Sequence, residues 1–184
     1  MEIIRIENLS KSYVEDKEIL IDVSLSIQSG EFIVFVGPSG CGKTTLLKSV
    51  NKLIPLSAGT IYFKDKKLSD WNTIELRRNI GYVIQQVGLF PHLSIEKNIG
   101  YVPSIQGKKR GDYHDRIVEL IQLVGLDTSD LNKYPHEISG GQAQRIGVAR
   151  ALASDPEVIL MDEPFGAVDE IQRRKLQDEL KYLH

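Results

Sequence analysis

The sequence has almost no cysteine, no long apolar run and little net charge, and each absence excludes a class of protein. Cys41 is the only cysteine in 184 residues, which excludes an intrachain disulfide and favours a reducing compartment. The longest apolar segments, such as 32–36 and 158–161, are far shorter than the roughly 18 residues of a membrane-spanning helix. The net charge of −2 gives no basic footprint for nucleic acid. We therefore expect a cytosolic globular chain that binds no nucleic acid.

Hydrophobic patterns divide the chain into strands and helices of one domain with an inserted subdomain. Residues 3–9 and the alternation of Val23, Leu25 and Ile27 predict antiparallel strands with one solvated face. The segment 32–36 is apolar at every position and predicts a strand covered on both faces. Further strands are expected at 59–63, 80–84 and 158–161, and helices at 43–51, 73–79, along the apolar face from Ile117 to Val124, and at 170–183.

A glycine-rich loop between the strand 32–36 and the next helix matches the phosphate-loop pattern in full. Its glycines allow backbone N–H groups to surround phosphate oxygens, and the helix that follows adds its dipole. Lys43 brings a positive charge to the outer phosphates, and Thr44 offers a hydroxyl to Mg²⁺. A tight glycine turn with an exposed lysine is the alternative, but the strand-loop-helix context favours the phosphate loop. The residues of this candidate site are Gly37, Pro38, Ser39, Gly40, Cys41, Gly42, Lys43, Thr44 and Thr45, with Cys41 as a small residue that fills the loop.

Two carboxylates follow the apolar segment 158–161, where the end of a parallel strand places them beside a phosphate loop. Asp162 is the candidate ligand for Mg²⁺. Glu163 is the candidate for polarising the attacking water. Taken alone, the pair could mark only the surface end of a strand, so its interpretation depends on the phosphate loop.

A second anion-binding pattern, Ser139-Gly140-Gly141-Gln142, precedes a helical run to Ala153. This pattern resembles the signature motif of the ABC ATPase family. With the phosphate loop and the acidic pair in the order of that family, the resemblance covers nearly the whole chain. Ile138 stands where leucine is more usual, a change of similar volume. The resemblance implies an α/β P-loop NTPase core with an N-terminal antiparallel β subdomain, formed by 1–87 and 157–184, and an inserted α-helical signature subdomain, 88–156.

The same resemblance implies roles for residues outside the loop. Tyr13 corresponds to the aromatic residue that stacks on adenine, although an exposed strand tyrosine would look the same. Gln85 corresponds to the glutamine that contacts Mg²⁺ and couples the site to membrane subunits, with Gln86 as the weaker candidate. Asp169 corresponds to the aspartate that organises the dimer interface, and it could equally be a helix N-cap.

The partners implied by the resemblance are a second copy of the chain, transmembrane permease subunits and, indirectly, a solute-binding protein. In the family, two copies form a head-to-tail dimer in which the signature motif of one contacts ATP on the phosphate loop of the other. The loop 87–93 would receive the permease, which implies a peripheral location on the cytoplasmic face of the membrane. ATP and Mg²⁺ are the implied ligands.

A narrower likeness lies in segments 50–55 and 80–92, which resemble the importer branch for quaternary-amine osmoprotectants such as glycine betaine, carnitine or choline. An importer of another solute, such as an amino acid, and a nucleotide-binding partner with little hydrolysis of its own are the alternatives. A DNA-repair ATPase would carry long coiled coils or zinc modules between its motifs, and a GTPase needs an Asn-Lys-x-Asp motif that residues 51–54 lack.

The family places a switch histidine after a further strand, and we expect this chain to stop before it. His184 does not follow such a strand, so we reject it as that residue. The sequence therefore predicts a single ABC ATPase domain, 1–184, that is incomplete at its C-terminus and turns ATP over slowly.

Overall fold

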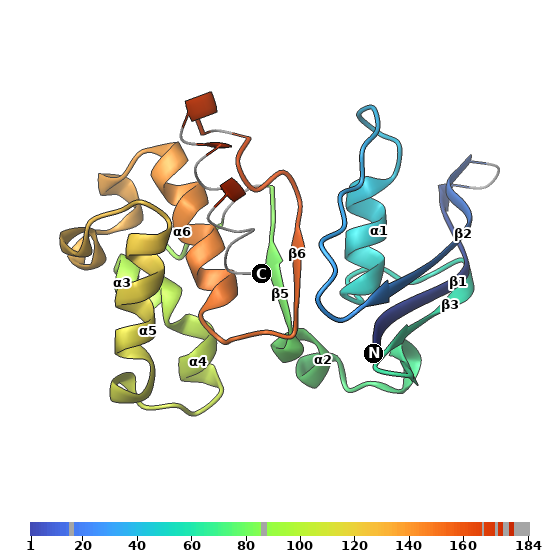
Figure 1. Cartoon of the computed structure of the whole chain (residues 1–184), viewed down its shortest axis with the longest axis horizontal. Helices are drawn as coiled ribbons and strands as arrows, with labels where there is room; N and C mark the ends of the chain where they lie inside the picture. The colour runs from blue at the N-terminus through green and yellow to red at the C-terminus, as the bar shows by residue number, and fades with distance from the viewer. Residues whose placement is uncertain (15–16, 86–87, 167, 172, 175–176, 179–184) are drawn as a thin grey trace. The chain divides into compact units, whose positions relative to one another are not determined.

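The computed structural model describes residues 1–14, 17–85, 88–166, 168–171, 173–174 and 177–178 (Figure 1). Its chain forms two compact units, Met1–Arg77 and Arg78–His184. This boundary differs from the predicted division into a core, 1–87 with 157–184, and a helical subdomain, 88–156, which stays a prediction. No described helix combines the length and the apolar character that crossing a membrane would take.

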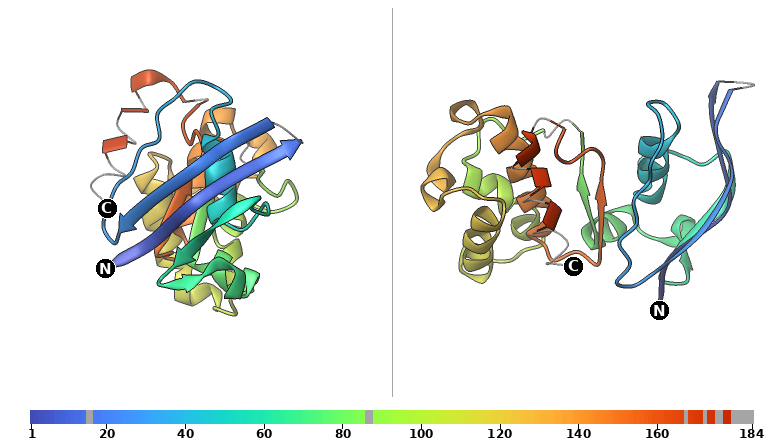
Figure 2. Two further views of the ribbon diagram at one scale, coloured as in Figure 1. Left: turned by 90° about the vertical axis from the view of Figure 1, so that its right-hand side faces the viewer. Right: turned by 45° about the horizontal axis from the view of Figure 1, so that its top comes forward.

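The N-terminal unit is built on an antiparallel sheet with the strand order β2-β1-β3-β4. The long strands β1 (Glu2–Val14) and β2 (Lys17–Gln28) form a twisted ribbon (Figure 2), which β3 (Ala58–Phe63) and β4 (Lys66–Lys67) extend. Leu9, Ile61 and Phe63 are buried on the covered face. The predicted antiparallel strands are thus confirmed, because alternating apolar residues give the sheet one face to bury.

Two α-helices and one short 3₁₀ helix begin in this unit: α1 (Lys43–Val50), η1 (Leu68–Asp70) and α2 (Thr73–Asn79). Helix α1 buries Leu46, Leu47 and Val50, and Asn51 is its C-cap residue. The side chain of Lys52 closes the turn after it, since its Nζ donates to the carbonyl oxygens of Leu68 at 2.8 Å and Trp71 at 3.0 Å. These contacts join the end of α1 to the segment that leads into α2.

The C-terminal unit contains a parallel pair of strands, β5 (Ile80–Val83) and β6 (Val158–Met161), with Ile80 opposite Val158 and Val83 opposite Met161. The chain between them is helical, as predicted. The helices and 3₁₀ turns are α3 (Ile95–Ile99), α4 (Tyr101–Ile105), α5 (Arg110–Leu123), η2 (Thr128–Asn132), η3 (Pro135–Glu137) and α6 (Gly140–Leu152).

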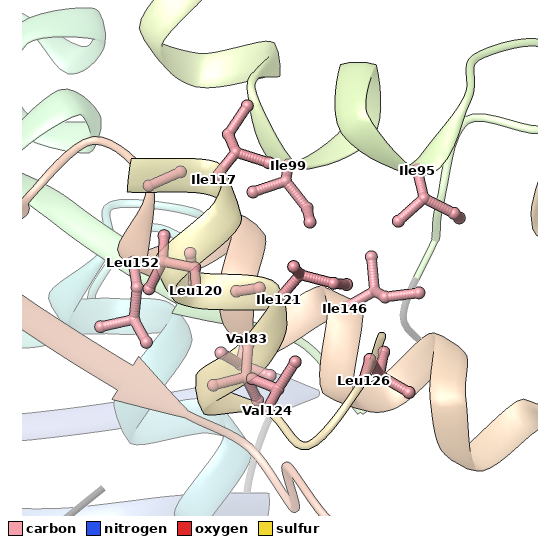
Figure 3. Packing of buried hydrophobic residues seen from close by; sticks show 14 of the residues in the cluster. Val83, Ile95, Ile99, Ile117, Leu120, Ile121, Val124, Leu126, Ile146 and Leu152 are labelled. Carbon is pink, nitrogen blue, oxygen red and sulfur yellow. The ribbon is translucent and has the colours of Figure 1, made fainter. Parts of the chain in front are cut away.

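An apolar core holds these helices together (Figure 3). The predicted apolar face of α5 supplies Ile117, Leu120 and Ile121, each at most 1% exposed, and α6 supplies Ile146. A repeat of apolar residues at helical spacing buries one stripe of each helix, which is why the sequence located this core.

The prediction of a strand at 32–36 is wrong. The segment carries no strand assignment, and its side chains are exposed, with Val36 at 91%. An apolar run favours a strand only where neighbouring strands supply backbone partners, and the two sheets, β2-β1-β3-β4 and β5-β6, do not include this segment. In the predicted helix at 170–183, residues 170–171, 173–174 and 177–178 are helical, and the others lie outside the described residues.

Candidate functional site

The predicted site residues fall into two groups, one in each unit. The N-terminal unit holds the phosphate loop and Tyr13. The C-terminal unit holds Gln85, the serine-glycine motif at 139–142, the acidic pair at 162–163 and Asp169. Gln86 and His184, which the sequence analysis also considered, lie outside the described residues.

The phosphate loop is a tight turn that leads into α1. Gly40 and Gly42 have φ angles of 81° and 98°, which lie in the left-handed region that glycine adopts without strain. The ammonium group of Lys43 lies across the turn, where it donates to the carbonyl oxygens of Gly37 at 2.7 Å and Pro38 at 3.0 Å. The loop thus holds a cation at the N-terminus of a helix, the place where a helix favours an anionic ligand.

Close packing fixes the loop against β2. A Cβ atom on Gly42 would lie 2.8 Å from Cδ2 of Leu20 and 3.0 Å from the carbonyl oxygen of Ile19. Any side chain at Gly42 would therefore collide with β2, in addition to the strain of its positive φ. The glycine lets the start of α1 approach the sheet directly.

Cys41 is a free, exposed thiol in the same turn. Its Sγ lies 3.5 Å from Nζ of Lys43, and a Cβ atom on Gly37 would come within 2.7 Å of that sulfur. The thiol therefore fills the space inside the turn, which agrees with the interpretation of Cys41 as a small filling residue.

The ends of the parallel strands bring two predicted residues together. Gln85 follows β5 and Glu163 follows β6, and Nε2 of Gln85 donates to Oε2 of Glu163 at 2.8 Å. The backbone N–H of Asp162 donates to the carbonyl oxygen of Val83 at 2.9 Å, which extends the ladder past β6. Asp162 is buried, and Glu163 is exposed with a φ of 49°. The chain turns sharply at Glu163, in a backbone conformation that is uncommon for residues other than glycine.

Tyr82 is a neighbour of the acidic pair that the sequence interpretation missed. Its hydroxyl group is buried and has no hydrogen-bond partner among the described residues. Burial, with a smaller contribution from the negative charge of Asp162, raises the pKa of Tyr82 to about 12. The phenol therefore stays neutral at physiological pH. The one feature of the sequence that could have identified Tyr82 is its position as a side chain with a polar group within an apolar strand.

The serine-glycine motif forms the first turn of α6. The hydroxyl of Ser139 accepts from the backbone N–H of Gln142 at 3.2 Å, and the side chain of Gln142 accepts from the N–H of Ser139 at 2.9 Å. This reciprocal pair is a capping box. A Cβ atom on Gly140 would meet nothing within 4 Å, so the space beside this glycine is open.

Asp169 has the position of a helix N-cap. It is exposed, and its backbone carbonyl accepts from the N–H of Arg173 at 2.8 Å. Its charge also acts on Arg145, whose guanidinium donates to the carbonyl oxygens of Val124 and Gly125 at the end of α5. Burial lowers the pKa of Arg145, and the charges of Asp169 and Asp130 oppose that shift. The N-cap alternative is thus supported, while the role in a dimer stays a prediction.

The predicted ligands for Mg²⁺ are a hydroxyl, an amide oxygen and a carboxylate, from Thr44, Gln85 and Asp162. Oxygen donors of this kind suit Mg²⁺, which needs few protein ligands when a substrate phosphate and water complete its coordination. The donor set therefore fits a metal that is bound together with a nucleotide.

Proteins of known function resemble the chain along nearly its whole length. The choline transport ATP-binding protein OpuBA of Bacillus subtilis is 52% identical over 97% of this chain and 47% of its own length. The glycine betaine/carnitine/choline transport ATP-binding protein OpuCA of the same organism is 50% identical over 98% and 47%. The osmoprotectant import ATP-binding protein OsmV of Salmonella typhimurium is 50% identical over 96% and 47%. The chain thus spans about half the length of these relatives.

A solved structure and a family model agree with these relatives. A dimeric ATP-binding cassette in a post-hydrolysis state, bound to ADP and Pi, matches with a TM-score of 0.89 at 32% identity, over 98% of this chain and 82% of that chain. The family model described as ABC transporter matches residues 20–166. The chain belongs to the ABC transporter family and has its ATPase fold.

Proposed function

We propose that the chain binds MgATP and hydrolyses it as the ATP-binding part of an importer for a quaternary-amine osmoprotectant. The observation that carries this proposal is the identity of 50–52% with relatives named for choline, carnitine and glycine betaine transport. Relatives named for Fe(3+) import are 39% identical over a similar share of the chain. The difference favours an amine solute over a metal ion.

Each group of residues has a role in this proposal. Lys43 and the N–H groups of the loop bind the phosphates, and Tyr13 stacks on adenine. Glu163 accepts the proton of the attacking water, while the amide of Gln85 holds its carboxylate in place at 2.8 Å. Thr44, Gln85 and Asp162 would hold Mg²⁺, which neutralises negative charge on the phosphate oxygens.

A second copy of the chain completes the site in the proposal. Ser139, Gly140 and Gly141 of one copy contact the γ-phosphate bound to the other, through a hydroxyl and the open N-terminus of α6. The match to a dimeric cassette supports this assembly.

The permease subunits contact the loop after Gln85, of which residues 88–93 are described. Phe90 in this loop packs on Tyr101 with ring centroids 4.5 Å apart, while Pro91 and His92 are exposed. A tip with exposed side chains on an anchored base suits a surface that receives another protein. Together with the permease, the chain would lie on the cytoplasmic face of the membrane and serve a solute-binding protein indirectly.

The proposal is tested by exchanging homologous segments. Residues 1–184 replace the matching segment of OpuBA from Bacillus subtilis in cells that lack their own amine importers, and labelled choline uptake is measured. We expect the chimera to restore uptake and the chimera with Lys43→Met to restore none. A second chimera carries residues 1–184 in place of the matching segment of an Fe(3+) import protein. It should restore a smaller fraction of iron uptake than the OpuBA chimera restores of choline uptake. Absent choline uptake with a stably expressed chimera, or equal restoration in both systems, would contradict the proposed solute class.

A further inference from the structure

Lys11 on β1 is a buried lysine with an aromatic partner. It is 8% exposed, and within the described ranges its ammonium group makes no ion pair and no hydrogen bond. Its Nζ lies 5.1 Å from the centroid of the Tyr13 ring, over the face of that ring. An ammonium group taken out of water needs a compensating partner, and the negative face of an aromatic ring supplies one.

The location of Lys11 connects this contact to the phosphate loop. Lys11 lies opposite Leu20 on β2, and residues directly opposite in an antiparallel pair have neighbouring side chains on one face. Leu20 is also the residue whose Cδ2 would lie 2.8 Å from a Cβ atom on Gly42. The lysine, the tyrosine and the start of α1 are therefore neighbours within the N-terminal unit.

Lys11 and Tyr13 are two residues apart on β1, the spacing that places side chains on one face of a strand. The register between β1 and β2 shifts between Leu9 and Lys11 and again between Lys11 and Ser12. At both shifts β2 advances one residue more than β1, so the extra residue, and the bend that accompanies a bulge, lie on β2 opposite Lys11.

Tyr13 remains 54% exposed while Lys11 lies over one face of its ring. A ring that is held by a cation on one side can present its other face to a second flat, aromatic group. A side chain fixed in this way also loses less conformational freedom when a base stacks on it.

We propose that Lys11 is a positioning residue for the nucleotide base: it holds the Tyr13 ring from one face and leaves the other for adenine. This inference rests on the proposed ATP binding and on the predicted role of Tyr13. The competing explanation is that Lys11 acts as a second cation for the phosphates. The two explanations can be distinguished, because the positioning of Tyr13 affects only ligands that have a base, whereas a cation for the phosphates also affects ligands without one.

The experiment compares MgATP with magnesium tripolyphosphate, which has phosphates and no base, as ligands of the purified chain. We expect Lys11→Met to raise the dissociation constant for ATP by about 2- to 30-fold and to leave that for tripolyphosphate unchanged. Lys11→Arg keeps the cation over the ring and should restore ATP affinity. In a Tyr13→Ala background, Lys11→Met should have no further effect on ATP binding.

Lys66→Met is the matched control, since Nζ of Lys66 lies 4.8 Å from the ring centroid of Trp71 in the same unit. It should change neither dissociation constant. Far-UV circular dichroism and tripolyphosphate binding report whether Lys11→Met folds, and Lys11→Gln replaces it if it does not.

Three results would overturn the inference: equal losses for both ligands, an unchanged ATP affinity, or a loss that persists without Tyr13. Failure of the unmodified chain to bind either ligand would instead contradict the proposed function. The two failures are therefore distinguishable.

Discussion

Replacing Glu163 by glutamine is expected to slow ATP hydrolysis by about 10²- to 10⁴-fold, the usual contribution of a general base. Glutamine keeps the size of the side chain but has no carboxylate to accept the proton of the attacking water. Gln85, whose amide donates to this carboxylate at 2.8 Å, can still bond to the new amide oxygen. The affinity for MgATP should therefore remain close to that of the unmodified chain. Phosphate release and equilibrium nucleotide binding, measured on the same preparation, check both parts.

Glu119→Gln provides the control for a lost negative charge in the same unit. Glu119 lies on α5, where its exposed carboxylate pairs with Arg116 at 3.2 Å, and its replacement should leave hydrolysis unchanged. Equal rates for Glu163→Gln and the unmodified chain would remove Glu163 from the proposed chemistry.

Replacing Asn98 by leucine is expected to destabilise the C-terminal unit by about 3 kcal/mol or more, since each buried polar group left without a partner costs about 1–3 kcal/mol. Asn98 is 0% exposed. Its Oδ1 accepts from the N–H of Phe90 at 2.7 Å, and its Nδ2 donates to the carbonyl oxygens of Phe90, Leu93 and Ser94 at 3.0–3.1 Å. Leucine has a similar volume and none of these bonds.

Thermal unfolding followed by circular dichroism measures this effect. For a chain of this size the expected fall in Tm is about 6–12 °C. Asn72→Ala is the control: the exposed Asn72 caps α2 through bonds to the N–H groups of Ile74 and Glu75, and losing such a cap costs about 1 kcal/mol. Equal shifts for the two variants would show that Asn98 does not hold the loop 88–94.

Local patterns in the sequence were sufficient to predict most of the elements. The bounds of α2 and β6 agree with the prediction, and β5 is one residue shorter than expected. The glycine loop could be recognised in the sequence because its glycines stand at the positions that need left-handed backbone angles, as the φ angles of Gly40 and Gly42 show. Gln85 and Glu163 meet because each follows a strand of a parallel pair. The carboxyl ends of parallel strands lie at the same edge of a sheet, whatever packs around them.

Features that depend on neighbours distant in the sequence were not predicted. The segment 32–36 has a strand-like composition, but composition does not show whether a neighbouring strand will pair with it, and neither sheet includes it. The burial of Lys11, which leaves the Tyr13 ring as the partner of its ammonium group, depends on how β1 packs and has no signature in composition. In the sequence, Asn98 looks like an ordinary polar residue of a short helix. It is buried because the loop before α3 folds over it, and the sequence does not show this contact.

Equilibrium binding of ATP, with Mg²⁺ present, to the purified chain and to Lys43→Met tests whether the glycine loop holds the phosphates of the nucleotide. We expect saturable binding to the unmodified chain and at least a tenfold weaker affinity in the variant, since a hydrogen bond from a charged group contributes about 1.5–3 kcal/mol. No binding to the unmodified chain, or equal affinities for the two proteins, would contradict a phosphate site built on this loop.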